Sequence, residues 1–138
     1  GAWVMDNVVP DDAAKYSYED IHSALEPLPL ASASHSTYRV ALSRSHQTPE
    51  THAHVEELRA EHPDLEIVEQ GSSYKFCLLA EGTVDYYVRT THTYEWDTAA
   101  AELILSEAGG ITRSLPDRQP LLYNKENLQN PWFECILL

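Results

Sequence analysis

Apolar positions along this chain fall into two kinds of segment. Short runs rich in β-branched and aromatic residues are typical of strands, whereas apolar residues spaced three and four apart indicate helices. The runs that predict strands are 2–5, 38–43, 65–69, 84–89, 111–113, 121–123 and 132–136. The segments that predict helices are 18–25, 49–62, 71–80 and 96–108.

Residues that begin and end helices support three of these predictions. Thr48 and Pro49 form a helix cap followed by proline in the first helical position, and Pro63 ends that helix. Gly82 follows the third helix and Gly109 follows the fourth, as glycine commonly does. In the fourth helix we expect one apolar face against the core, formed by Ala100, Leu103, Ile104 and Ala108.

Residues 11–36 are the least regular part of the chain. A break at Pro10 precedes them. The sequences Glu-Pro-Leu-Pro at 26–29 and Ser-Ala-Ser-His-Ser at 32–36 are typical of turns and loops. We place no chemistry in this part of the chain.

The order of the elements after residue 36 predicts the fold class. Strands alternate with helices, which favours an α/β layered domain whose helices cover a largely parallel sheet. In such sheets, ligands bind where strands end and helices begin. Positions 45–46, 71–75 and 97 all lie at junctions of this kind.

The composition fits one globular domain. The chain has 138 residues, of which 43% are hydrophobic and 22% are charged. No apolar run approaches the ~20 residues that cross a bilayer, and the first residues do not resemble a signal peptide. Cys77 and Cys135 lie in apolar segments and predict buried free thiols in a cytoplasmic protein.

The net charge of −13 limits the partners of this chain. Nucleic acids and anionic membranes require a basic face, so we exclude both classes. An acidic protein also repels anionic small molecules unless cations or a divalent metal are placed locally. Nine lysine and arginine residues are present, and two of them, Lys75 and Arg89, lie at boundaries of predicted elements.

The segment 71–75, Gly-Ser-Ser-Tyr-Lys, is a candidate anion site. A helix start offers free backbone N–H groups and the positive end of the helix dipole, and Ser72 adds a hydroxyl. Lys75 lies in the first turn, where the dipole disfavours a cation, so its presence there suggests a function. The alternative is that Ser72 only caps the helix.

Arg89 and Asp97 are the other charged candidates, and each has two interpretations. Arg89 ends an apolar strand and is either a surface residue or an anion ligand. Asp97 begins the next helix and is either an acid favoured by the dipole or a metal ligand. One carboxylate does not hold Mg²⁺, so further ligands would come from outside this chain or from the bound molecule.

The histidines do not have the spacing of a metal site. His52 and His54 are two residues apart on one predicted helix and therefore do not share a face. Third and fourth ligands are also missing, so we do not expect zinc. The sequence lacks a Gly-x-Ser-x-Gly elbow, a Cys-x-x-Cys pair and a P-loop.

Two sets of residues resemble a known family. Trp-Asp-Thr-Ala-Ala at 96–100, followed by Glu-Ala-Gly-Gly at 107–110, resembles the second signature of the inositol monophosphatase superfamily, which are Mg²⁺-dependent phosphomonoesterases. Ser-Arg-Ser-His at 43–46 and the segment 71–82 are similar to its 3'(2'),5'-bisphosphate nucleotidase branch, the CysQ type. Inositol phosphatases have a small residue in place of Lys75 and typically an acid in place of Arg89. The pair therefore points to a nucleotide with an extra phosphate.

The resemblance implies the C-terminal, substrate-binding domain of the sugar-phosphatase fold over residues 1–138. The nucleotide and its 5'-phosphate would contact four residues: His46, Ser72, Lys75 and Arg89. Asp97 would be a catalytic ligand of Mg²⁺, of which the complete enzyme would hold two or more. The reaction would remove the 3'-phosphate of adenosine 3',5'-bisphosphate to give AMP, in sulfate assimilation. Alternatives are an inositol- or sugar-phosphate phosphatase of the same superfamily, or a non-catalytic nucleotide-binding module.

The chain departs from the family pattern in two respects. Ala101 stands where the pattern usually has glycine. The first half of the family's sequence, with a metal-binding glutamate and an Asp-Pro-Ile-Asp-Gly motif, is missing. We therefore expect this chain alone to be inactive and to bind metal poorly, with an N-terminal metal-binding domain of the same protein as its partner.

Overall fold

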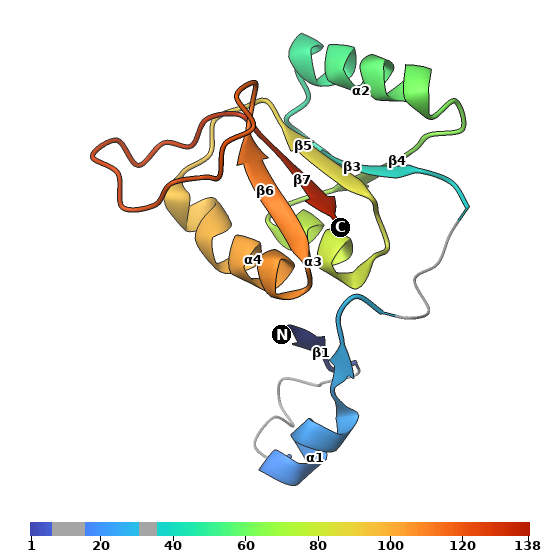
Figure 1. Ribbon diagram of the computed structural model, residues 1–138, viewed down its shortest axis with the longest axis vertical. Helices are drawn as coiled ribbons and strands as arrows, with labels where there is room; N and C mark the ends of the chain where they lie inside the picture. Colours follow the sequence, from blue (N-terminus) through green and yellow to red (C-terminus); the bar gives the residue numbers. More distant parts are fainter. Residues whose placement is uncertain (7–15, 31–35) are drawn as a thin grey trace.

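The computed structural model describes residues 1–6, 16–30 and 36–138 (Figure 1). The predicted break at Pro10 and most of the predicted turn at 32–36 lie outside the described residues. In chain order the elements are β1 (Trp3–Val4), α1 (Tyr18–Ala24), β2 (Glu26–Pro27), β3 (Arg39–Ser43), α2 (Pro49–Glu61), β4 (Glu66–Gln70), α3 (Tyr74–Glu81), β5 (Tyr86–Arg89), α4 (Glu95–Glu107), β6 (Gly110–Ser114) and β7 (Phe133–Leu137).

Five of these strands form one sheet in the order β4-β3-β5-β7-β6. β3 pairs in parallel with β4 on one side and with β5 on the other. β7 runs antiparallel between β5 and β6. All the strands of the sheet except β7 therefore point the same way, which confirms the predicted α/β fold with a largely parallel sheet.

Helices cover both faces of this sheet (Figure 1). α2 lies on one face, where Val55 is buried with Val40 and other residues of β3 and β5. α3 and α4 lie side by side on the opposite face, where Phe76 and Leu105 are buried with Phe133 of β7. The sheet thus separates two apolar clusters, and the larger one lies under α3 and α4.

The buried face of α4 differs from the predicted one. Ala100, Leu103 and Ile104 are exposed, whereas Ala101 and Leu105 are buried and Ala108 follows on the same side. α4 is apolar around most of its circumference, so spacing alone does not select one stripe. Contacts with α3 and β6 determine which side of α4 is buried. The remaining apolar residues form a stripe on the outer side of the helix.

Side chains of α4 hold the segment between β6 and β7. Glu95 accepts hydrogen bonds from the backbone N–H groups of Asn124, at 2.6 Å, and Lys125, at 3.1 Å. The Lys125 ammonium lies 2.5 Å from the same carboxylate. These contacts hold residues 124 and 125. The structure assigns no strand to residues 121–123, so the strand predicted there is wrong.

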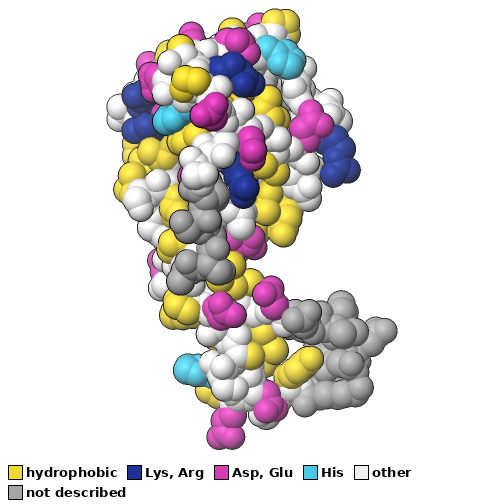
Figure 2. Space-filling view, turned by 90° about the vertical axis from the view of Figure 1, so that its right-hand side faces the viewer, with side chains coloured by type: hydrophobic (Ala, Val, Ile, Leu, Met, Phe, Trp, Pro, Cys, Tyr) yellow, Lys and Arg dark blue, Asp and Glu magenta, His cyan; other side chains and the backbone are white. Residues whose placement is uncertain are grey.

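The N-terminal elements lie apart from the sheet. Among the described residues, β1 pairs with β2 alone, antiparallel, and α1 begins at a Ser17 cap and buries none of its residues. In Figure 2 the part of the molecule that holds α1 projects below the main body, and acidic side chains are scattered over both. In the described part of the chain, no helix combines the length and the apolar character that crossing a bilayer requires.

Gly110 at the start of β6 leaves room for a side chain of α4. A Cβ added there would lie 2.3 Å from Leu105 Cδ1 and 2.9 Å from the carbonyl oxygen of Ile136. We expect Gly110→Ala to lower the free energy of unfolding by about 1–3 kcal/mol, because the added methyl overpacks the core. The measurement is the urea midpoint at unchanged slope.

Gly71→Ala is the matched control for this prediction. No atom lies within 4 Å of the Cβ added at Gly71. That variant should therefore be neutral or slightly stabilising, since alanine restricts the unfolded chain. Equal losses in the two variants would contradict the packing explanation.

Candidate functional site

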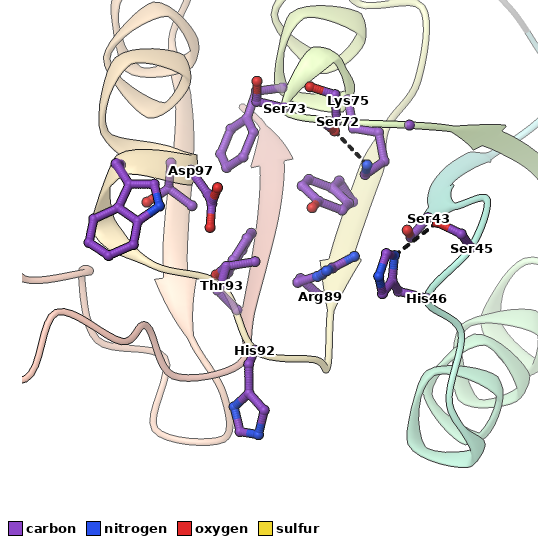
Figure 3. Close-up of a pocket in the computed structure, with 16 residues that line it drawn as sticks. Ser43, Ser45, His46, Ser72, Ser73, Lys75, Arg89, His92, Thr93 and Asp97 are labelled. Carbon is purple, nitrogen blue, oxygen red and sulfur yellow. Dashed lines mark hydrogen bonds between the residues drawn. The ribbon is translucent and has the colours of Figure 1, made fainter.

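A cavity of about 330 Å³ opens where β3, β4 and β5 end (Figure 3). It brings together all five residues singled out from the sequence: His46, Ser72, Lys75, Arg89 and Asp97. The other lining residues are Ser43, Ser45, Gly71, Ser73, Phe76, Tyr87, His92, Thr93, Trp96, Thr98 and Phe133. The junctions expected from the strand–helix order therefore meet at one place, as they do in open α/β sheets.

The junction from β3 to α2 supplies serines and a histidine. Ser43 is the buried last residue of β3, and Ser45 and His46 follow it in an exposed loop. The Ser45 hydroxyl lies 2.9 Å from His46 Nδ1. Because Ser45 contacts Nδ1, the other ring nitrogen, Nε2, is left for a ligand. At the rim of the cavity it can form a hydrogen bond with a ligand oxygen.

Lys75 is a buried cation held by the chain that precedes it. Its side chain is 2% exposed, and its ammonium donates to the carbonyl oxygens of Ser72, at 2.6 Å, and Gln70, at 3.1 Å. The same nitrogen lies 5.0 Å from the centroid of the Tyr87 ring. Burial and the nearby Arg89 charge lower the pKa of Lys75 to about 8. An ammonium has three N–H donors, so one remains for a ligand in the cavity.

The turn before α3 takes its shape from these contacts. α3 begins at Tyr74, later than predicted, and Ser73 rather than Ser72 occupies the cap position. Ser72 has a φ of 60°, in the left-handed region that is costly for a residue with a Cβ. Because Lys75 binds the Ser72 carbonyl, the turn is held in this conformation, in which both serines line the cavity.

Arg89 carries a donor without a partner. It is the last residue of β5 and pairs with Phe133 of β7. Its Nε atom is buried, and no acceptor within the described part of the protein reaches it. In Figure 3 its guanidinium extends toward His46. A buried donor left unsatisfied is costly, so this group is suited to an acceptor that enters the cavity.

Asp97 lies across the cavity from Arg89 in Figure 3. It is in the first turn of α4, and its Oδ2 accepts a hydrogen bond from the Tyr94 N–H at 2.8 Å. This bond fixes the carboxylate and leaves Oδ1 for a ligand. Over the described ranges, no three His, Cys, Asp or Glu side chains gather in a group that would hold a metal. Asp97 therefore offers a cation a single carboxylate.

Several residues at or near the cavity were missed in the sequence, among them Asn130 and Phe133. Asn130 is buried, and its Nδ2 donates to Thr93 Oγ1 at 3.2 Å and Thr98 Oγ1 at 3.1 Å, which ties the entry to α4 to the chain before β7. Phe133 forms part of the cavity floor. An Asn-Pro pair at 130–131 signals a turn, but no sequence signal places β7 beside β5.

The sequence pattern of the Inositol monophosphatase family matches residues 13–131. Two similar proteins carry the name 3'(2'),5'-bisphosphate nucleotidase CysQ. The Escherichia coli protein is 39% identical over 99 residues, which are 71% of this chain and 38% of that protein. The Haemophilus influenzae protein is 48% identical over 71 residues, which are 51% of this chain and 26% of that protein. The chain thus spans well under half of these relatives.

Solved structures show the same fold. The crystal structure of CysQ from Bacteroides thetaiotaomicron, described as a bacterial member of the inositol monophosphatase family, superposes with a TM-score of 0.81 at 37% identity. That match covers 97% of this chain and 46% of the other. A structure of SaIMPase-II with bound inositol monophosphate has a TM-score of 0.60 at 17% identity, over 81% of this chain and 42% of the other, and shares the fold alone.

Proposed function

This chain belongs to the inositol monophosphatase family, and on that premise we propose that it is the substrate-binding part of a 3'(2'),5'-bisphosphate nucleotidase. The complete protein would remove the 3'-phosphate of adenosine 3',5'-bisphosphate to give AMP. The similarity to proteins named CysQ supports this choice within the family. Because those proteins are more than twice as long as the matched part, the activity is proposed for the complete protein.

The observation that carries the proposal is a pair of cations in one cavity. Lys75 is buried with one donor to spare, and Arg89 has a buried Nε without an acceptor in the described chain. Both lie in a cavity on a protein whose net charge is −13. Two positive groups are more than one phosphate requires when a metal also binds it, so a second phosphate on the substrate accounts for both.

Each of the five candidate residues has a role in this proposal. Lys75 and Arg89 bind the 5'-phosphate, and the Ser72 hydroxyl donates a further hydrogen bond to it. His46 contacts the nucleoside at the rim of the cavity. Asp97 lies on the opposite side, where the 3'-phosphate is cleaved, and its Tyr94 contact keeps the carboxylate in one orientation. The distance between the two sides of the cavity would then select a substrate with two phosphates.

Mg²⁺ is the cofactor that we propose for the complete protein. When bound, it would activate a water molecule and stabilise the charge on the phosphoryl group. Asp97 alone does not meet the near-octahedral oxygen coordination of Mg²⁺, so the described residues do not form a complete metal site. Further ligands would come from an N-terminal domain of the same protein. Accordingly, we expect residues 1–138 alone to be inactive.

The test is the substrate preference of the complete protein with Mg²⁺. Release of phosphate is compared for adenosine 3',5'-bisphosphate, inositol 1-phosphate and fructose 1,6-bisphosphate. The proposal expects the nucleotide to have the highest kcat/KM. A preference for inositol or fructose phosphates would instead assign a sugar-phosphate phosphatase of the same family, and nucleotide binding without turnover would indicate a non-catalytic module.

We also propose that the complete protein acts in sulfate assimilation in the cytoplasm. The unpaired Cys77 and Cys135 support the cytoplasmic location.

Ionisation of Lys75 should limit the activity of this site at alkaline pH. Its pKa of about 8 means that the ammonium loses its proton as pH rises through that value, while the substrate phosphates stay ionised. Because kcat/KM reports ionisations of the free enzyme, it should fall above about pH 8. Lys75→Arg keeps the charge at all accessible pH values and should move this limb upward. An unchanged alkaline limb in that variant would exclude Lys75 as its source.

A further inference from the structure

Three threonine hydroxyls meet beside the cavity. Thr90 Oγ1 lies 2.5 Å from Thr51 Oγ1 and 3.1 Å from Thr48 Oγ1. Thr48 and Thr51 lie 3.3 Å apart and cap each other's backbone N–H groups at the start of α2. Thr51 is 3% exposed and Thr90 is 6% exposed. We call these three residues the threonine ring.

The ring satisfies its own hydrogen bonds without solvent. Each hydroxyl has one O–H to donate and can accept two hydrogen bonds. Thr51 can donate to Thr90, Thr90 to Thr48, and Thr48 back to Thr51, while Thr48 and Thr51 also accept backbone N–H groups. Removal of one hydroxyl leaves buried partners without a donor or an acceptor, which is more costly than the loss of one bond.

The ring joins two segments that are distant in sequence and adjacent at the site. Thr90 directly follows Arg89, and successive residues of a strand point to opposite faces, so Arg89 lines the cavity while Thr90 contacts α2. Thr48 follows His46 by two residues. The hydroxyl contacts therefore connect the backbone that carries Arg89 to the backbone that carries His46.

α2 does not depend on the threonine ring alone for its attachment to the sheet. α2 is already attached to the sheet by buried Val55 and by His54, whose Nε2 lies 2.6 Å from the Tyr86 hydroxyl. That hydroxyl in turn donates to the buried carboxylate of Glu134 on β7. These contacts fix the middle of the helix. The ring fixes its first turn, at the edge of the cavity.

We propose that Thr51 and Thr90 are positioning residues that set the distance between Arg89 and His46. In Figure 3 the Arg89 guanidinium extends toward the His46 ring, so their spacing determines what fits between them. On the proposed function, on which this inference rests, that space receives the 5'-phosphate end of the nucleotide. The ring would then control affinity for substrates that carry this phosphate and leave bond cleavage unaffected.

The kinetic test compares Thr90→Val, which keeps the shape but removes the hydroxyl, with Thr90→Ser, which keeps the hydroxyl. In the complete protein, Thr90→Val should raise KM for adenosine 3',5'-bisphosphate about tenfold with little change in kcat, the size expected for one buried hydrogen bond. KM for adenosine 3'-monophosphate, which lacks the 5'-phosphate that Arg89 binds, should rise much less, and Thr90→Ser should behave as wild type. Equal effects on both substrates, or no effect, would overturn the proposal.

Two further measurements separate this inference from other failures. Tyr86→Phe breaks the other attachment of α2 and should lower stability without changing KM for the bisphosphate. Hydrogen exchange of the free protein should show faster exchange at residues 44–48 and 89–92 together in Thr90→Val, and not in Thr90→Ser. If wild type does not cleave the bisphosphate, the proposed function fails, but exchange still decides the coupling. Faster exchange in one segment alone, or in neither, would overturn it.

Discussion

Replacing Asp97 with asparagine should lower kcat/KM of the complete protein by roughly a thousandfold. A metal ligand contributes several kcal/mol to stabilisation of the transition state, and each 1.36 kcal/mol is a factor of about ten in rate. Asparagine keeps an oxygen that can accept the Tyr94 N–H, so the start of α4 should be retained. The loss would then come from the missing charge at the cavity. The measurement is phosphate release at saturating Mg²⁺ and over a Mg²⁺ titration.

Glu95→Gln is a suitable control for this variant. Glu95 is also an acid in the first turn of α4, but it binds Lys125 and Asn124 and does not line the cavity. Glu95→Gln should therefore lower the stability of the protein more than its catalytic activity. Replacing a metal ligand should lower activity by much more than about threefold. If Asp97→Asn keeps activity within about threefold of wild type, this carboxylate does not act on a metal in the reaction.

Replacing Phe133 with alanine should lower the free energy of unfolding by about 3–5 kcal/mol, the usual cost of truncating a buried aromatic residue. Phe133 is fully buried between two rings, with centroids 5.6 Å from Tyr87 and 5.9 Å from Phe76. It also pairs with Arg89 and Ser114 on the strands at either side. The loss is a large fraction of the roughly 5–15 kcal/mol that stabilises a typical domain.

The neighbouring Trp132 provides the control, because it is an aromatic residue of the same segment that is 41% exposed. Trp132→Ala keeps the backbone carbonyl that accepts the Leu115 N–H, and it should cost about 1 kcal/mol or less. Urea midpoints at equal slope measure both variants. Similar losses in the two would mean that Phe133 contributes no more than an exposed ring and that the packing under α3 is loose.

Most of the fold was predictable because its signals are local. Thr48, Pro49 and Gly82 mark helix ends in the sequence, and the structure places them at those ends. The strand–helix alternation predicted a largely parallel sheet, and the sheet has that form. Its junctions predicted where charged side chains would meet, and the cavity lies there. Each helix end and each strand was inferred from residues only a few positions apart, and their order along the chain gave the rest.

The parts that were not predictable depend on contacts between distant segments. The outward side of α4 follows from where α3 and β6 lie against it. Glu102 binds the Tyr123 hydroxyl and Glu95 binds the next two residues, where a strand was predicted to lie nearby. The position of Lys75 in the sequence suggested a function but not its partners, and the structure shows that two carbonyl groups of the preceding turn bind it. These contacts could not be inferred from the sequence, because they accompany a left-handed conformation of Ser72 that a serine seldom adopts.

The antiparallel position of β7 has a consequence for the order in which this protein is made. The strands β3, β4 and β5 can pair with one another as soon as the chain has passed Arg89. β6 is made before β7 but has β7 as its ladder partner in the sheet, so it stays unpaired until β7 has also left the ribosome. The floor of the cavity is completed at the same step, since Phe133 begins β7. A chain that has released β6 but not yet β7 therefore has an exposed strand edge and an open cavity, a state in which aggregation competes with folding.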